Sequence, residues 1–147
     1  AQKNENIDII WTTKLALEIF NEQNIIFQSK LGSLNVKIDR TNLIRVITNL
    51  VKNAIQATEN IKDSKIIVSV KKLRNKAIIE IEDNGDGIPR KNREKIFEPK
   101  FTTKSKGMGL GLSIIKNLVT NYNGKIDFVS KKGKTIFKIE LPIHKNV

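Results

Sequence analysis

The chain has 147 residues, no cysteine and a formal net charge of +12. This length allows one domain with a sizeable core, and the lack of cysteine excludes a disulfide scaffold and a thiolate metal site. No apolar run is long enough to span a bilayer, and the N-terminus has no signal-peptide pattern. The lack of cysteine fits a cytoplasmic setting, and a membrane anchor elsewhere in the parent protein stays open.

The positive charge comes mostly from lysines that are spread along the sequence and are not interleaved with aromatic residues. A nucleic-acid interface usually concentrates basic charge and supplies stacking side chains. We therefore expect a lysine-rich surface without a nucleic-acid partner, with part of the charge used for phosphate groups. His144 is the single histidine. Its position near the C-terminus favours a solvated side chain over a catalytic one.

Hydrophobic spacing predicts the elements of the first half of the chain. A helix is expected over residues 6–22 with Asn6 as its cap, followed by strands at 24–31 and 34–38 with a turn at Gly32 and Ser33. A longer helix is expected over 41–60, starting near Asp39, because Asp and Asn favour helix N-termini.

A polar line runs beside the apolar stripe of this second helix. It contains Asn49, Lys52, Asn53 and Gln56, whose spacings of three and four place them on one side. Asparagine is unfavourable inside helices because it competes for backbone hydrogen bonds. Two asparagines one turn apart therefore suggest a function, and a solvated flank is the alternative.

A hairpin is predicted over residues 65–82, and its second strand runs into Asp83, Gly85 and Gly87 in an Asp-x-Gly-x-Gly pattern. A carboxylate at a strand end can accept a hydrogen bond from the amine of a flat ring. Glycines allow such a ring to approach the backbone closely. An ordinary turn is the alternative interpretation, because Asn-Gly and Asp-Gly are common turn dipeptides.

The second half of the chain contains a charged loop, a glycine run and a last hairpin. Residues 90–106 predict a short helical turn and then a mobile lid, with residues 100–106 poorly fixed in the absence of nucleotide. The run at 107–112 leads into a helix over 112–122, so it aims backbone N–H groups at one point that suits phosphate; a flexible linker is the alternative. Strands are expected at 125–130 and 135–141. The fold class is therefore α+β: a two-layer sandwich with helices on one face of a mixed, mainly antiparallel sheet.

Four motifs in this order resemble the catalytic ATP-binding domain of sensor histidine kinases, in the superfamily that also contains gyrase B and MutL. They are the N box at 49–54 (NLVKNA), the first Gly box at 83–89 (DNGDGIP), the F box at 96–103 (IFEPKFTT) and the second Gly box at 107–112 (GMGLGL). The resemblance covers essentially the whole chain, 1–147. It is nearest the nitrogen-regulation type and implies the Bergerat ATP-binding fold.

The resemblance implies ATP and Mg²⁺ as cofactors and a role for each matching position. Asp83 would hold the adenine amine, and Asn53 would offer its amide oxygen to Mg²⁺. Asn49 would complete the polar line near the phosphates, where Lys52 would pair with phosphate charge. The residues that would line the base pocket are Gly85, Gly87, Ile88 and Thr135.

The glycine run and the lid would enclose the triphosphate. The residues implied to wrap it are Gly107, Met108, Gly109, Leu110, Gly111 and Leu112. Thr102, Thr103 and Lys104 would close as the lid, and Phe97 and Phe101 would anchor that lid on the domain.

The implied activity is transfer of the γ-phosphoryl group of ATP to a histidine, as in two-component signal transduction. Asn49 stands where the superfamily's hydrolases place a glutamate, and an amide cannot take a proton from water, which favours phosphotransfer over hydrolysis. The family's phosphoacceptor pattern is absent from the chain. We therefore expect a C-terminal catalytic fragment that does not autophosphorylate alone, that serves its own homodimeric dimerisation domain and a response regulator, and that makes no direct membrane contact.

Two alternatives remain open at this point. An anti-sigma-factor Ser/Thr kinase of the same fold would phosphorylate a separate protein. A non-catalytic module would bind ATP without transferring phosphate.

Overall fold

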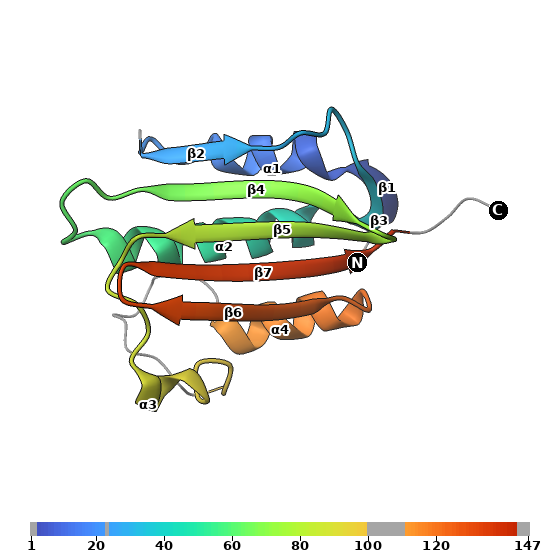
Figure 1. The fold of residues 1–147 in the computed structure, drawn as a ribbon. Coiled ribbons are helices and arrows are strands. Elements are labelled where there is room, and N and C mark those ends of the chain that lie inside the picture. Colours follow the sequence, from blue (N-terminus) through green and yellow to red (C-terminus); the bar gives the residue numbers. More distant parts are fainter. Residues whose placement is uncertain (1–2, 23, 100–110, 144–147) are drawn as a thin grey trace.

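The computed structural model describes residues 3–22, 24–99 and 111–143 of the chain. The described residues form a five-stranded sheet, and Figure 1 shows α1, α2 and α4 on one face of it. The sheet has the order β2-β4-β5-β7-β6, in which β2 is parallel to β4 and the other pairs are antiparallel. The predicted two-layer α+β class is confirmed.

The strands of this sheet are β2 (Ile25–Gln28), β4 (Ile66–Leu73), β5 (Lys76–Asp83), β6 (Lys125–Lys131) and β7 (Lys134–Pro142). A separate two-stranded sheet consists of β1 (Asn4–Asp8) and β3 (Asn35–Asp39). The helices are α1 (Ile9–Leu17), α2 (Arg40–Thr58), α3 (Arg90–Arg93) and α4 (Leu112–Asn121). Among the described residues, none of these helices has the length and apolar character needed to cross a bilayer.

The core lies between the sheet and α2. Alternate residues of β5, from Ala77 through Ile79 to Ile81, are buried, as are Leu43 and Ile47 on α2. Because side chains alternate along a strand, the next inward position of β5 is that of Asp83. The strand therefore aims one carboxylate at the helix side of the sheet, at the end of an otherwise apolar row.

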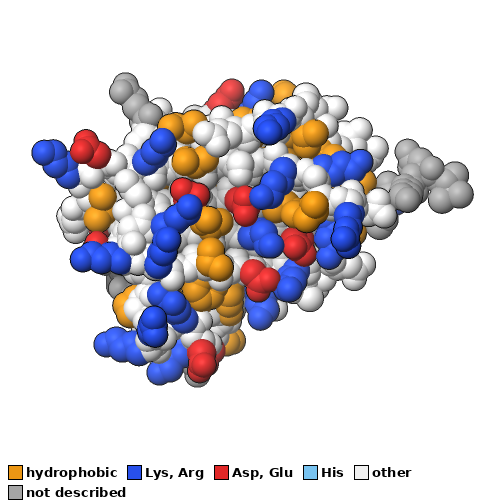
Figure 2. All heavy atoms as spheres, viewed as in Figure 1, with side chains coloured by type: hydrophobic (Ala, Val, Ile, Leu, Met, Phe, Trp, Pro, Cys, Tyr) orange, Lys and Arg blue, Asp and Glu red, His pale blue; other side chains and the backbone are white. Residues whose placement is uncertain are grey.

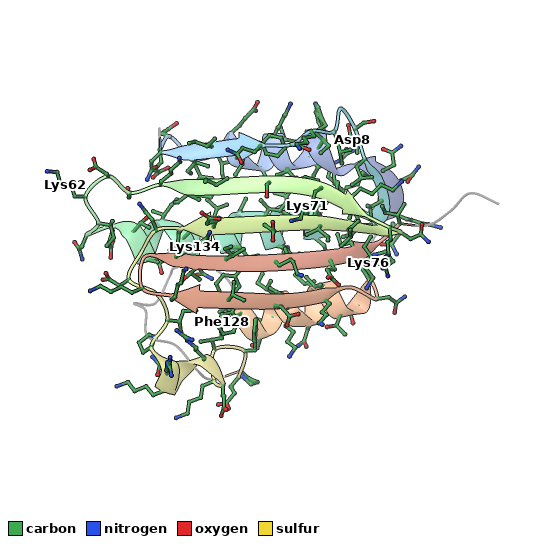
Figure 3. The ribbon with its side chains drawn as sticks, viewed as in Figure 1. Asp8, Lys62, Lys71, Lys76, Phe128 and Lys134 are labelled. Carbon is green, nitrogen blue, oxygen red and sulfur yellow. The ribbon has the colours of Figure 1, made fainter. Side chains whose placement is uncertain are left out.

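The outer face of the sheet carries charge of both signs, as Figure 2 shows. Lys71 pairs with Glu80 at 3.0 Å, and Lys138 pairs with Glu140 at 3.5 Å. Figure 3 shows Lys71, Lys76 and Lys134 over this face. The lysines that dominate the composition are thus mixed with carboxylates here.

The start of α2 agrees with the sequence prediction. Asp39 is the N-cap, and its Oδ1 accepts the N–H of Asn42 at 3.1 Å. The helix ends at Thr58, two residues before the predicted end.

The predicted helix over 6–22 is wrong at both ends, because α1 begins at Ile9 and ends at Leu17. Residues 4–8 form β1, in which Ile7 lies opposite Val36 of β3 and is 2% exposed. The helix then starts at Ile9 under a cap from Asp8, whose Oδ1 accepts the N–H of Ile10 at 3.0 Å. Ile7 fitted a helical spacing, but it is buried as a strand residue because β3 pairs with it.

The strands predicted at 24–31 and 34–38 do not pair with each other. The first is shortened to β2, which joins the edge of the large sheet beside β4. The second is β3, which pairs with β1. The later hairpins agree with prediction. The helix predicted over 112–122 is α4, which ends at Asn121 and is followed by a residue in the left-handed region, Asn123, with φ of 60°.

Candidate functional site

Asp83 ends β5 with a buried carboxylate that is 5% exposed. Its Oδ1 accepts the N–H of Gly85 at 2.9 Å, which fixes the first turn after the strand. The residue directly opposite on β7 is Thr135, which is 4% exposed. Opposed side chains on antiparallel strands have Cβ atoms about 5 Å apart. A carboxylate and a hydroxyl therefore face the same space.

The two glycines after Asp83 are held between α2 and the β6–β7 hairpin. A Cβ on Gly85 would lie 2.5 Å from the carbonyl oxygen of Ala57 in α2. Gly87 has φ of 88°, and a Cβ there would lie 2.6 Å from the carbonyl oxygen of Lys131. The packing of the turn itself thus requires glycine at both positions, a reason that the sequence did not reveal.

The polar line of α2 is only partly solvated. Asn49 is 7% exposed, and its Nδ2 donates to the carbonyl of Arg45 at 2.7 Å. Asn53 and Gln56 are half-buried, whereas Lys52 is exposed. The amide nitrogen and oxygen of Gln56 are both buried, and neither has a hydrogen-bond partner within the described part of the chain. A solvated flank describes Lys52 but does not describe Asn49 or Gln56.

These features meet at one end of the domain. Figure 1 shows the end of β5, the start of β7, the C-terminal half of α2 and the N-terminus of α4 at its left side. The close approach of Gly85 to Ala57 joins the Asp83 turn to α2, one turn after Asn53. Figure 3 places Lys62 and Lys134 at this end and Lys76 at the other. The site thus combines buried acceptors and amides on the helix side of the sheet, whereas Lys134 lies on the outer face with its Nζ 4.0 Å from Glu82.

Phe97 anchors the segment that follows α3. Its ring centroid lies 6.0 Å from that of Phe128 on β6, which in turn lies 5.6 Å from that of Phe137 on β7. The Lys116 Nζ of α4 sits 5.2 Å from the Phe97 ring centroid. These contacts tie the segment that precedes the expected lid to both layers of the fold.

Ile88 and the start of α4 complete the described part of the predicted site. Ile88 is half-buried and packs against the hydrophobic core. Gly111 is the exposed N-cap of α4, and Leu112 is the first residue of the helix. Glycine supplies no capping side chain, so the first N–H groups of α4 can bind an anion.

The other predicted site residues lie outside the described ranges, as do His144 and the expectation of a poorly fixed segment over 100–106. These site residues are Phe101, Thr102, Thr103, Lys104, Gly107, Met108, Gly109 and Leu110.

Two residues at the site were not among those predicted. The Oγ of Ser130 accepts the N–H of Ile88 at 2.8 Å and lies 2.7 Å from the Oγ1 of Thr135. Asn84 connects the Asp83 turn to the loop before β4: its Oδ1 accepts the N–H of Lys65 at 2.8 Å, and its Nδ2 donates to the carbonyl of Asp63 at 3.0 Å. Asn84 could have been suspected from its place inside the motif, whereas Ser130 gave no local signal.

Comparisons with known proteins agree with this geometry. Residues 38–145 match the model of the family described as histidine kinase-, DNA gyrase B- and HSP90-like ATPases. The chain is 34% identical over 119 residues to the sensory histidine kinase/phosphatase NtrB of Azospirillum brasilense, covering 71% of this chain and 30% of that protein. The NtrB of Vibrio alginolyticus is 32% identical over 152 residues, covering 95% of this chain and 43% of that protein. The chain thus spans less than half the length of these relatives.

Solved structures show the same relationship. The catalytic domain of histidine kinase ThkA, in a nucleotide-free form, superposes with a TM-score of 0.86 at 30% identity and covers 96% of each chain. The mycobacterial sensor histidine kinase MprB gives a TM-score of 0.77 at 26% identity, covering 95% of this chain and 97% of that one. The chain therefore belongs to the histidine kinase-, DNA gyrase B- and HSP90-like ATPase family, as an ATP-binding catalytic domain of the histidine kinase type.

Proposed function

We propose that this domain binds ATP with Mg²⁺ and donates the γ-phosphoryl group to a histidine on a separate dimerisation domain. The observation that carries the proposal is the pairing of buried Asp83 with Thr135 above a turn whose glycines leave no room for a Cβ. An ionised carboxylate only accepts hydrogen bonds, so it suits an exocyclic amine such as that of adenine. The turn and Ile88 would form one wall of the base pocket.

The amides of α2 fit a metal-bound triphosphate. Mg²⁺ prefers oxygen ligands and keeps several waters, so one amide oxygen, from half-buried Asn53, is a sufficient protein contribution. Buried polar atoms are normally hydrogen-bonded, and the buried amide of Gln56 fits a site whose polar partners arrive with the ligand. The N-terminus of α4 and exposed Lys52 would neutralise phosphate charge.

Transfer to a histidine, with little hydrolysis, follows from the residue at position 49. The Asn49 Nδ2 is committed to the Arg45 carbonyl, and its amide cannot accept a proton from water. In the transfer, the bond from the γ-phosphorus to its bridging oxygen breaks as a histidine nitrogen bonds to phosphorus, and ADP leaves. The domain's own part is positioning and charge neutralisation.

The proposed partners are the chain's own dimerisation domain, in a homodimer, and a response regulator. The matched relatives are sensory histidine kinase/phosphatases, and one solved relative is the histidine kinase ThkA in complex with the response regulator TrrA, with a TM-score of 0.82 at 28% identity. That match covers 96% of this chain and 42% of the ThkA chain. We place this activity in the cytoplasm, where ATP is supplied.

Titration calorimetry with ATP and Mg²⁺ tests nucleotide binding. The wild type is expected to bind, and Asp83→Ala is expected to bind about 10- to 100-fold more weakly, because a buried charged acceptor is lost. Asp127→Ala is the matched control, since this Asp is exposed on β6 and, within the described part of the chain, forms its ion pair with Lys125 on the surface. Full ATP binding by Asp83→Ala would refute the base-pocket assignment.

Radiolabel from γ-labelled ATP tests the transfer. The chain alone is expected to remain unlabelled, whereas adding the dimerisation domain of its own parent protein should give label on that domain. Phosphohistidine is lost in acid and survives alkali, in contrast to phosphoserine. Acid-stable label on a partner would instead identify a Ser/Thr kinase, and rapid steady-state hydrolysis by the chain alone would contradict the role assigned to Asn49.

A further inference from the structure

The end of the β6–β7 hairpin contacts the turn after Asp83, which contains Gly85 and Gly87, at three points. Gly133 donates its N–H to the Gly85 carbonyl at 2.9 Å. Ile88 donates its N–H to the Ser130 Oγ at 2.8 Å, and Gly87 packs against the Lys131 carbonyl. The Ser130 hydroxyl is therefore fixed against the turn that forms the wall of the proposed base pocket.

The same hydroxyl reaches Thr135 of β7, which lies opposite Asp83 of β5. The two hydroxyl oxygens are 2.7 Å apart, so one of them donates to the other. Ser130 already accepts from Ile88, whose backbone N–H cannot reverse its role. If Ser130 donates to Thr135, its single proton and one of its two lone pairs are used, and the Thr135 proton remains available on the side that faces Asp83.

The opposite arrangement fits less well. Ser130 would then accept two protons and need an acceptor for its own. The described residues give its hydroxyl no partner beyond Ile88 and Thr135. Thr135, by contrast, faces the space that it shares with the Asp83 carboxylate.

We propose that Ser130 is a positioning residue that makes the Thr135 hydroxyl a proton donor toward the purine ring, so that the pocket reads an amine and the adjacent ring nitrogen together. Asp83 accepts from the amine, and Thr135 donates to the neighbouring ring nitrogen, directly or through one water. Adenine presents this donor–acceptor pair, whereas guanine and hypoxanthine present a carbonyl and an N–H there. This inference rests on the proposed function and adds a residue that selects the base.

The test is calorimetry with ATP and with 1-deaza-ATP, in which C–H replaces the ring nitrogen beside the amine. The wild type is expected to bind 1-deaza-ATP about three- to tenfold more weakly than ATP, the value of one hydrogen bond. Ser130→Ala is expected to weaken ATP binding by a similar factor and to bring the ratio of the two dissociation constants close to one. Thr135→Val should have the same two effects. The double variant, Ser130→Ala with Thr135→Val, should lose no more ATP affinity than the weaker-binding of the two single variants.

Controls separate this role from support of the turn. Ser130→Thr should restore both ATP affinity and the ratio, and Ser69→Ala, at a half-buried position on the outward side of β4, should change neither. Ser130→Cys keeps the shape of the side chain but forms only weak hydrogen bonds. It replaces Ser130→Ala in the test if the melting curve of Ser130→Ala shows that this variant does not fold. If Ser130→Ala and Ser130→Cys lose the same factor in affinity for ATP and for 1-deaza-ATP, the inference is overturned. The proposed function, ATP binding by the wild type, would still stand. A wild type that binds neither nucleotide would instead refute the proposed function.

Discussion

Gly87 and Gly133 have almost the same left-handed backbone, with φ of 88° and 87°, but different surroundings. A Cβ on Gly87 would strike the Lys131 carbonyl, whereas a Cβ on Gly133 would meet nothing within 4 Å. The two positions therefore separate backbone strain from steric exclusion at the site.

Alanine substitutions at these two glycines should have unequal costs. Gly133→Ala is expected to lower the free energy of unfolding by about 1 kcal/mol, the cost of a left-handed backbone for a residue with Cβ. Gly87→Ala should cost clearly more, because the turn must also move away from β6, and it should weaken ATP binding. Urea unfolding and calorimetry measure the two effects. Equal destabilisation by both variants would show that the turn is not confined as described.

At the scale of elements, one carboxylate connects the N-terminal strand to the helix that carries the polar line. The Asp39 Oδ2 accepts the N–H of Lys3 at 2.7 Å, while its Oδ1 caps α2. The hydrogen bonds from the backbone of Lys3 and then of Asn42 hold the pKa of the Asp39 carboxyl below its usual value of 3.8. The helix of the proposed metal site is thus attached to the start of the described chain.

This attachment predicts an acid sensitivity. A carboxyl whose pKa is depressed on folding stabilises the fold above its unfolded pKa, and that stabilisation is lost as the pH falls through the folded pKa. Asp39→Asn keeps an oxygen for the cap but loses the charge. It should therefore melt at a lower temperature than the wild type at pH 7, and the difference should shrink as the pH falls below 3.8. Circular dichroism melts across this range measure it, with Asp127→Asn on exposed β6 as the control; a difference that is independent of pH would contradict the assignment.

At the scale of the whole molecule, the fold uses residues that the family model does not cover. The match to the family model begins at residue 38, within β3. The ThkA catalytic domain nevertheless superposes over 96% of the chain. Ile7 of β1 and Ile9 of α1 are in the core, at 2% and 0% exposure. The N-terminal part is therefore integrated into the same core as the site.

Two isoleucine substitutions test this integration. Ile7→Ala is expected to lower the free energy of unfolding by about 2–5 kcal/mol, because it leaves a cavity in the core. Ile26→Ala on the edge strand β2 should cost much less, since Ile26 is 38% exposed. Urea unfolding at neutral pH gives both values. Similar small losses for the two variants would mean that β1 is only loosely attached.

Prediction from the sequence succeeded where the signal is local. The 3.6-residue spacing of α2 begins after its N-cap, Asp39, and the alternation in β5 ends at Asp83. Both signals lie within a few neighbouring residues. Prediction failed for β1 and β2, because Ile7 satisfies a helical spacing as well as a strand, and only contact with Val36 decides between them. The choice between helix and strand there depends on contacts between residues that are far apart in the sequence.

The sequence by itself determined the order of most elements and the positions of the four motifs, since periodicity, caps and turns are written within a few residues of each other. Tertiary structure alone decided the parallel placement of β2, the confinement of Gly85 by Ala57, and the contact between Ser130 and Ile88, which are 42 residues apart. Such contacts depend on how the layers of the fold pack. A local sequence pattern therefore cannot predict which distant carbonyl or hydroxyl group will lie next to it.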